Sequence, residues 1–291
     1  SSMRWPTGRG CAREQIGCDM RILACCGFAG DQSLVNRYIP ELEKAVFHGH
    51  PGNKGHAIVW GEALGAQLED MSAYQGHGGL AYGHGIPILW PLIMEGGVQV
   101  NQNGKRFSDE TEGYSEQAVK VLDQPGSFAW SVFDQTRHEL MLKFDDYQDA
   151  MRAGAVKSAD TLAELAQEIG IPADALEATI AEVNACAASG EPDSFGRDFS
   201  GKRPLSPTFY AAKVTGALFH TQGGLAINTR AQVLRKDRTA FPNLYAGGGA
   251  ARGISGTGSS GYMAGNGLLT ATSLGKIAGR DAARRLRENQ T

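Results

Sequence analysis

The sequence lacks a long apolar run and lacks an excess of charge of either sign. No segment approaches the roughly 18 consecutive apolar residues that a membrane-spanning helix requires. Lys and Arg total 28, and Asp and Glu total 31, among 291 residues. Nucleic acids and anionic membranes usually bind a face with a basic excess, so this balance disfavours both as partners. We expect no membrane span and no nucleic-acid partner.

The sequence also lacks the short motifs that mark several metal and phosphate sites. It contains no CxxC, no HExxH and no GxxxxGK[ST], which argues against a thiol redox pair, a zinc-protease helix and a P-loop. The histidines within 48–56 are more typical of a turn than of a metal site, so we expect no metal. An odd number of cysteines without paired spacing favours a reducing, cytoplasmic setting. These cysteines are Cys11, Cys18, Cys25, Cys26 and Cys186.

Glycine, in contrast, is abundant. The chain has 39 glycines in 291 residues, about twice the average share of roughly 7%. They gather in the ranges 49–65, 76–85, 96–104 and 247–267. Glycines on loops between apolar segments indicate close approach of the backbone to a ligand, or positive φ angles. The alternative interpretation is a set of tight turns.

Apolar patterning predicts strands interleaved with helices, which favours an α/β fold. The predicted strands are 21–30, 128–134, 209–214, 223–234 and 243–248, with a hairpin around Asn103-Gly104 in 97–107. The predicted helices are 31–47 with a break at Pro40, 53–68 with Ile58, Leu64 and Leu68 on one face, 161–170, 172–190 and 268–286.

Local signals support the later helices. Thr161 and Glu164 fit a capping box, and Pro172 is suited to open the next helix. The final helix repeats apolar residues at spacings of three and four, which predicts one buried face. That face comprises Leu268, Ala271, Leu274, Ala278, Ala282 and Leu286.

The segment GISGTGSSGYMAGNG, residues 253–267, feeds this final helix. A glycine-rich loop before a helix usually directs backbone amides at a negatively charged or electron-rich group. Part of the loop, 256–261, spells GxGxxG. The dinucleotide fingerprint also requires a second strand after the helix, and the given sequence stops at that helix, which disfavours a nicotinamide enzyme. The segment 8–13 fails the same pattern because Arg13 occupies the third glycine position.

Several segments taken together resemble a known flavoprotein family. It contains the flavin subunits of fumarate reductase and succinate dehydrogenase and the 3-ketosteroid dehydrogenases. The resemblance covers roughly the last three-fifths of a family member, and nothing before Arg21 matches the family's first GxGxxG unit. The segments that carry the resemblance are 22–31, 52–68, 100–110, 160–184, 220–228, 243–250 and 261–279.

The resemblance implies a fold, a cofactor and a reaction class. The fold is an α/β, incomplete FAD-binding domain at 1–88 and 214–291, with an inserted α+β capping domain at 89–213. The cofactor is FAD, and the reaction is hydride transfer between flavin N5 and an activated C=C bond. The implied partners are a small-molecule substrate and an electron-transfer partner. A non-catalytic flavoprotein remnant is the alternative.

The resemblance also implies which residues bind the flavin. In the family, the N-terminus of the final helix faces the pyrimidine edge of the ring, where reduction places negative charge that free amides stabilise. Gly248 stands where the family usually has a glutamate. The implied cofactor-binding residues are Gly27, Gly247, Gly248, Gly265, Asn266, Gly267 and Leu268.

The implied catalytic residues depart from the fumarate reductases. Tyr114 and Tyr262 occupy the places of two arginines, one a proton donor and one a carboxylate clamp, while His220 matches a substrate-binding histidine. A bidentate Arg–carboxylate contact is about twice as strong as a neutral hydrogen bond, and tyrosine cannot replace it. We therefore expect an enone or enoate rather than a C4-dicarboxylate, with Tyr114 carrying the proton and Tyr262 and His220 completing the catalytic set.

Further residues are expected to bind substrate. His77 matches another family histidine, and Trp90 lies in the Leu89-Trp90 pair that replaces the family's Thr-Glu. Arg252 is expected to pair with a carboxylate if the substrate is an acid, and Ser259 lies in the same glycine loop. The five ring residues have structural alternatives: a helix-start aromatic for Tyr114, a loop contact for Tyr262, a hydrophobic wall for Trp90, a strand-end histidine for His220 and a histidine in a mobile turn for His77.

Overall fold

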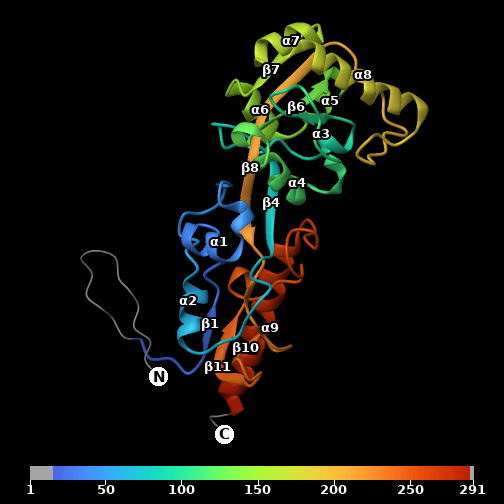
Figure 1. Cartoon of the computed structure of the whole chain (residues 1–291). Coiled ribbons are helices and arrows are strands. Elements are labelled where there is room, and N and C mark those ends of the chain that lie inside the picture. Colours follow the sequence, from blue (N-terminus) through green and yellow to red (C-terminus); the bar gives the residue numbers. More distant parts are fainter. Residues whose placement is uncertain (1–15, 289–291) are drawn as a thin grey trace.

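The computed structural model describes residues 16–288. Cys11 and the segment 8–13 lie outside the described residues. Two lobes follow one another along a long axis, and the strands β4 (Tyr74–Ala81) and β8 (Phe209–Thr221) run between them (Figure 1). The first strand, β1 (Arg21–Leu23), and the last helix, α9 (Asn266–Glu288), both lie in the lower lobe (Figure 1).

The lower lobe is built on a mixed sheet covered by the last helix. Strand β1 (Arg21–Leu23) pairs in parallel with β11 (Ala240–Ala246), which pairs in antiparallel with β10 (Gln232–Leu234). Helix α9 (Asn266–Glu288) packs Ala278 and Ala282 against Tyr245. The remaining elements of this lobe are α1 (Gln32–Tyr38), η1 (Pro40–Leu42), α2 (His56–Ala63), β3 (Leu68–Glu69), β9 (Gly224–Leu225) and η4 (Gly248–Ala250).

Strand β8 organises the second sheet. Its partners are β2 (Val46–Phe47), which is parallel to it, and β4, β6 (Ala129–Asp134) and β7 (Val156–Ala159), which are antiparallel; β5 (Val98–Val100) pairs with β6. The upper lobe adds α3 (Pro91–Met94), η2 (Glu110–Glu112), α4 (Tyr114–Leu122), η3 (Pro125–Ser127), α5 (Gln135–Met141), α6 (Asp145–Arg152), α7 (Leu162–Ile169) and α8 (Ala173–Ser189).

The core of the upper lobe combines apolar packing with a buried ionic cluster. Helices α7 and α8 bury Leu165 and Ile180 against β5 and β6. Beside this core, Glu110 accepts hydrogen bonds at 2.7 Å from both Arg106 and Arg197. All three side chains are at least nine-tenths buried. Buried charges in this number are tolerated only when each is paired, so the cluster holds η2 to distant segments.

Several sequence predictions are confirmed. The helix that begins at α1 ends at Tyr38 and resumes as the short η1, which starts at Pro40. Thr161 and Glu164 form the predicted capping box of α7. Strand β6 lies within the predicted 128–134. These helix boundaries are predicted correctly because they depend on residues that are close together in the sequence, such as the two hydrogen-bonding residues of the capping box.

Other predictions are wrong in ways that tertiary packing explains. The strand predicted over 21–30 ends at Leu23. Gly104 does form a turn, with φ +73°, but β5 pairs with β6 rather than with residues after that turn. Of the helical face predicted over 53–68, Ile58 is buried, whereas Leu64 is 43% exposed and Leu68 belongs to β3.

The predicted buried face of α9 is right only in its second half. Ala278 and Ala282 are buried, but Leu268 is 77% exposed. Strand β8 continues without interruption across the predicted boundary at 213/214. The exposed first turn of α9 lies beside a cavity.

Candidate functional site

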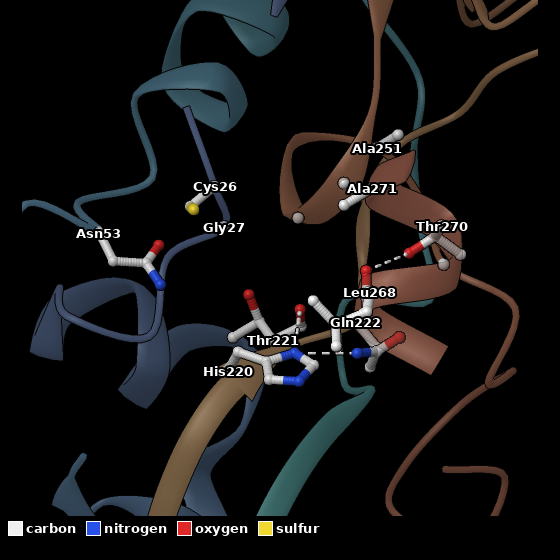
Figure 2. A pocket seen from close by; sticks show the side chains of 14 residues that line it. Cys26, Gly27, Asn53, His220, Thr221, Gln222, Ala251, Leu268, Thr270 and Ala271 are labelled. Atoms are coloured by element: carbon white, nitrogen blue, oxygen red, sulfur yellow. Dashed lines mark hydrogen bonds between the residues drawn. The ribbon is translucent and has the colours of Figure 1, made fainter. Parts of the chain in front are cut away.

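A cavity of about 330 Å³ opens beside the first turn of α9. This volume falls within the roughly 300–1,000 Å³ typical of small-molecule sites. Figure 2 shows Cys26 and Asn53 on one side, Leu268 and Ala271 on the other, and His220 between them at the base. The cavity therefore lies among segments that are far apart in the sequence.

The start of α9 gives the cavity a wall of backbone donors. The first amides of a helix have no intrahelical acceptor, and the helix dipole places partial positive charge there. Gly267 and Leu268 belong to this first turn and line the cavity. Such a wall favours an electron-rich or anionic edge of a ligand.

The predicted cofactor-binding residues divide into two groups. Gly27, Gly248, Gly267 and Leu268 line the cavity. The others stand behind it: Gly247 lies against α9 near Leu274, Gly265 has φ +93° just before the helix, and the buried Asn266 donates from Nδ2 to Ser255 Oγ at 3.2 Å.

Glycine is required at one of these positions by a close approach. A Cβ atom on Gly267 would lie 2.9 Å from Cε1 and 3.1 Å from Nε2 of His220. Any side chain at this position would push the imidazole away from the first turn of α9. The contact therefore sets the position of His220 relative to the helix.

The structure brings the predicted catalytic and substrate-binding aromatics together. The Tyr114 ring lies 5.4 Å from His77, 6.2 Å from Trp90 and 6.2 Å from Tyr262 between centroids. The Tyr262 ring lies 5.7 Å from His220, which also lines the cavity. We refer to His77, Trp90, Tyr114, His220 and Tyr262 as the aromatic cluster.

Different elements supply these rings. His77 lies on β4, Trp90 directly precedes α3, and Tyr114 is the first residue of α4. His220 lies near the end of β8, and Tyr262 lies in the glycine loop before α9. The cluster therefore joins the upper-lobe helices to the loop that begins α9.

Burial keeps the ionisable rings of the aromatic cluster neutral at pH 7. Desolvation is the main cause that lowers the pKa of His77 to about 4, and the charge of the nearby His48 is a second, smaller cause. Desolvation also lowers the pKa of His220. Desolvation raises the pKa of Tyr114 and raises that of Tyr262 to about 12. The two phenol groups share a hydrogen bond. The aromatic cluster therefore offers neutral donors and acceptors rather than charge.

The side chains of the remaining predicted residues, Arg252 and Ser259, have other partners in the structure. Arg252 pairs through Nε with Asp70 at 2.5 Å and through Nη1 with Glu69 at 2.8 Å. A substrate carboxylate would have to compete with these two anions. Ser259 hydrogen-bonds the Tyr74 phenol. Roles for Arg252 and Ser259 in substrate binding stay predictions.

Sequence reasoning missed several residues that line the cavity or contact its ring residues. Phe219 stacks on His77 at 5.2 Å, and Gln222 Nε2 lies 2.9 Å from His220 Nδ1. The position of both within two residues of His220 was the available signal. Asn53 lines the cavity, and its buried Oδ1 has no hydrogen-bond partner among the described residues.

The chemistry of these groups fits a flavin ring. Helix amides suit the electron-rich N1 and O2 edge, the unpartnered Asn53 oxygen suits a ring N–H, and Leu268 and Ala271 suit a flat apolar face. Within residues 16–288 no group of three or more His, Cys, Asp or Glu is placed to hold a metal ion. The fold and the cavity together define a mixed α/β protein of the flavin-binding class.

Comparison with known proteins identifies the family. The chain belongs to the family described as FAD binding domain, which matches residues 13–268. It is 30% identical to a fumarate reductase (cytochrome) of Shewanella frigidimarina, over 94% of this chain and 47% of that protein. It is likewise 30% identical to a 3-oxosteroid 1-dehydrogenase of Mycobacterium tuberculosis, over 81% of this chain and 48% of that protein.

A solved structure gives the same result. The open conformation of a flavocytochrome c3 fumarate reductase matches with a TM-score of 0.74 and 28% identity, over 94% of this chain and 47% of that one. The chain thus spans about half the length of these relatives. The family and its relatives establish FAD as the cofactor and confirm the predicted flavoprotein resemblance. No helix in the described part of the chain is long and apolar enough to cross a membrane.

Proposed function

We propose that this chain carries the substrate site of an FAD-dependent oxidoreductase acting on a C=C bond next to a carbonyl or carboxylate. The supporting observation is the aromatic cluster, in which residues predicted separately form one contiguous group beside the first turn of α9. When bound, FAD supplies the ring that donates or accepts the hydride.

The substrate class follows from the lack of charge in the aromatic cluster. Its ionisable members are neutral at pH 7, and the guanidinium of Arg252 is paired with Glu69 and Asp70. A dicarboxylate would lose its hydration without gaining charged partners. A planar enone, or an enoate with a single carboxylate, can instead use neutral donors and ring faces. We therefore infer an enone or enoate substrate, and fumarate itself is disfavoured.

The residues of the aromatic cluster have different roles in the proposed reaction. The His220 imidazole binds and polarises the carbonyl oxygen. In the reducing direction one alkene carbon receives a hydride and its neighbour receives the proton from Tyr114 Oη, and the phenol regains its proton from water. Tyr262 holds Tyr114 through the shared hydrogen bond. Trp90, which is 8% exposed, provides an apolar wall.

The two lobes suit a closing site. We propose that residues 89–213 act as a capping domain over a flavin-domain portion at 1–88 and 214–291, with β4 and β8 as the connections (Figure 1). Closure would exclude water from the reacting hydride. Electrons would enter or leave through a separate electron-transfer partner.

The test begins with FAD. The purified chain is titrated with FAD, and binding is followed by the quenching of flavin fluorescence and by the rise in melting temperature. The loaded protein is then photoreduced and mixed with cyclohex-2-enone or with fumarate. We expect the enone to reoxidise the flavin faster than fumarate does. Faster reoxidation by fumarate would overturn the substrate class, and failure to bind FAD would favour a non-catalytic remnant.

A further inference from the structure

Gln222 occupies a fixed position two residues after His220, where β8 has just ended. Its backbone N–H donates to the Ala73 carbonyl at 2.7 Å, and its carbonyl accepts from the Gly253 N–H at 2.8 Å. The residue is 4% exposed. Because the backbone is held on both sides, its amide side chain has little freedom to reorient.

A chain of hydrogen bonds runs from the start of α9 to His220. Asn266 Nδ2 donates to Ser255 Oγ at 3.2 Å, and Ser255 Oγ donates to Gln222 Oε1 at 3.2 Å. The last link joins Gln222 Nε2 to His220 Nδ1 at 2.9 Å, and Figure 2 marks it with a dashed line. The chain links residues of the glycine loop and α9 to the end of β8.

The direction of donation along this chain determines the tautomer of His220. Ser255 uses an oxygen lone pair to accept from Asn266, so its single proton is free for Gln222 Oε1. With Oε1 engaged in this way, the amide presents Nε2 to the imidazole. An amide nitrogen can only donate, so His220 Nδ1 is the acceptor and the neutral ring carries its proton on Nε2.

A competing contact favours the other tautomer but is longer. His220 Nδ1 also lies 3.5 Å from the Thr221 carbonyl, which would accept a proton placed on Nδ1. Hydrogen bonds from ring nitrogens normally fall between roughly 2.7 and 3.2 Å. The 2.9 Å contact with Gln222 lies inside this range and the Thr221 contact lies outside it.

The Cε1–Nε2 edge of His220 lies beside a residue that forms part of the cavity wall. It lies against Gly267 in the first turn of α9, where an added Cβ would be 3.1 Å away, and His220 and Gly267 both line the cavity. A proton on Nε2 is thus available to a ligand there. The opposite tautomer would present a lone pair, which repels a carbonyl oxygen.

We propose that Gln222 is a positioning residue that holds His220 as the Nε2–H tautomer, so that the imidazole presents a hydrogen-bond donor to the substrate carbonyl. Ser255 and Asn266 fix the amide of Gln222 in the orientation this requires. The role of the donor rests on the function proposed above, whereas the tautomer itself does not. Through Asn266, the donor is linked to the helix turn assigned to the flavin.

The experiment measures the tautomer directly on the chain without FAD. Histidine labelled with ¹⁵N is incorporated, the His220 signals are assigned by their loss in His220→Gln, and the shifts of the two ring nitrogens identify which one is protonated. We expect the proton on Nε2 in the unaltered chain. A proton on Nδ1 would overturn the proposal.

Gln222→Glu provides the sharpest variant because it keeps the shape and replaces the donor with an acceptor. We expect the proton to move to Nδ1 and the pKa of His220 to rise. Tyr262 is the titratable ring that contacts His220. Gln167→Glu, exposed on α7, is the matched control and should leave both unchanged. An unchanged tautomer in a folded Gln222→Glu would contradict the proposal.

Gln222→Met removes the hydrogen bond to His220 Nδ1 while keeping a side chain of nearly the same length. In FAD-loaded protein we expect kcat/KM for an enone to fall about tenfold, which corresponds to a lost hydrogen bond of roughly 1.4 kcal/mol. Unaltered kcat/KM would remove the link between tautomer and catalysis. If the tautomers behave as expected but the unaltered protein turns over no enone, the proposed function fails while the assignment of Gln222 stands.

Discussion

At the scale of single residues, the site depends on neutral groups held away from water. The phenols of Tyr114 and Tyr262 share a hydrogen bond, and desolvation raises both pKa values. A phenol kept protonated at pH 7 can donate a proton and recover it without a stable phenolate. The neighbouring imidazoles are neutral for the same reason, because burial disfavours the charged form.

Tyr114→Phe should separate catalysis from binding. We expect kcat to fall by roughly 10²–10⁴-fold, because the proton donor is lost, while FAD content stays the same. Turnover of a cyclic enone and flavin absorbance measured on the same sample provide the check. Tyr82→Phe, 46% exposed on the loop after β4, is the control and should change neither quantity. Parallel loss of flavin and turnover would show a structural role instead.

His77 should make stability depend on pH. Its Nδ1 accepts from the Gly79 N–H at 3.0 Å, and burial lowers its pKa from 6.5 to about 4. Between these values the unfolded chain binds more protons, so the stabilisation is complete above pH 6.5 and is lost as the pH falls towards 4. The expected loss is roughly 3 kcal/mol.

Urea unfolding at pH 7.5 and pH 5 measures this effect. In His77→Gln the difference in unfolding free energy between the two pH values should shrink, although a smaller dependence from His220 remains because its pKa is also lowered. An equal pH dependence in the variant and the unaltered chain would exclude His77 as its source.

At the scale of elements, the first turn of α9 forms a cavity wall and leaves its leucine side chains largely unburied. Leu268 and Leu269 are 77% and 54% exposed, while Ala278 and Ala282 further along the helix are buried. Exposed leucines at a helix start lose the stabilisation of burial, roughly 1.5–3 kcal/mol each. The helix therefore has one half that packs and one half that faces the cavity.

Gly267→Ala tests this division. The added methyl would lie 2.9 Å from His220 Cε1, so the imidazole must shift. We expect weaker FAD binding and altered His220 ring shifts with little loss of helix stability. Gly275→Ala on the same helix meets no atom within 4 Å and should stabilise the protein by roughly 0.5–1 kcal/mol. Thermal unfolding and FAD titration of both variants provide the measurement, and identical FAD affinities would contradict the close approach.

At the scale of the whole molecule, one strand connects the two lobes and one ionic cluster ties together segments of the upper lobe. Strand β8 pairs with strands of both the upper and the connecting regions, so the lobes share a continuous backbone ladder. In the upper lobe, Glu110 joins Arg106, which is four residues away, to Arg197, which is 87 residues away along the chain. These contacts hold η2, which ends two residues before Tyr114 in the chain.

Glu110→Ala should destabilise the protein strongly. It leaves two guanidinium groups buried near each other without their shared anion, and we expect a loss of about 3–5 kcal/mol in unfolding free energy. Urea unfolding at pH 7 measures this value. Glu164→Ala, which breaks only an exposed capping box, should cost about 1 kcal/mol or less. Similar losses in the two variants would show that the cluster contributes little.

The sequence by itself determined the features that neighbouring residues specify. The break at Pro40, the capping box of Thr161 and the glycine loop before α9 all depend on groups a few residues apart. It also determined the family, because ordered segments along the chain match the FAD-binding domain. The ring residues of the aromatic cluster could be named one by one from that resemblance.

Only the tertiary structure decided how these residues meet. Strand β5 pairs with β6 rather than with a local hairpin partner, and Leu268 faces a cavity. Arg252 is paired with Glu69 and Asp70, and Gln222 orients His220. The pairing of β5 with β6 and the ion pairs of Arg252 join groups separated by tens to hundreds of residues along the chain, and Gln222 is itself held by Ser255, which is 33 residues away. Periodicity reports whether a side chain is buried or exposed on average, but the partner it meets depends on how distant segments pack, and that packing decided the site.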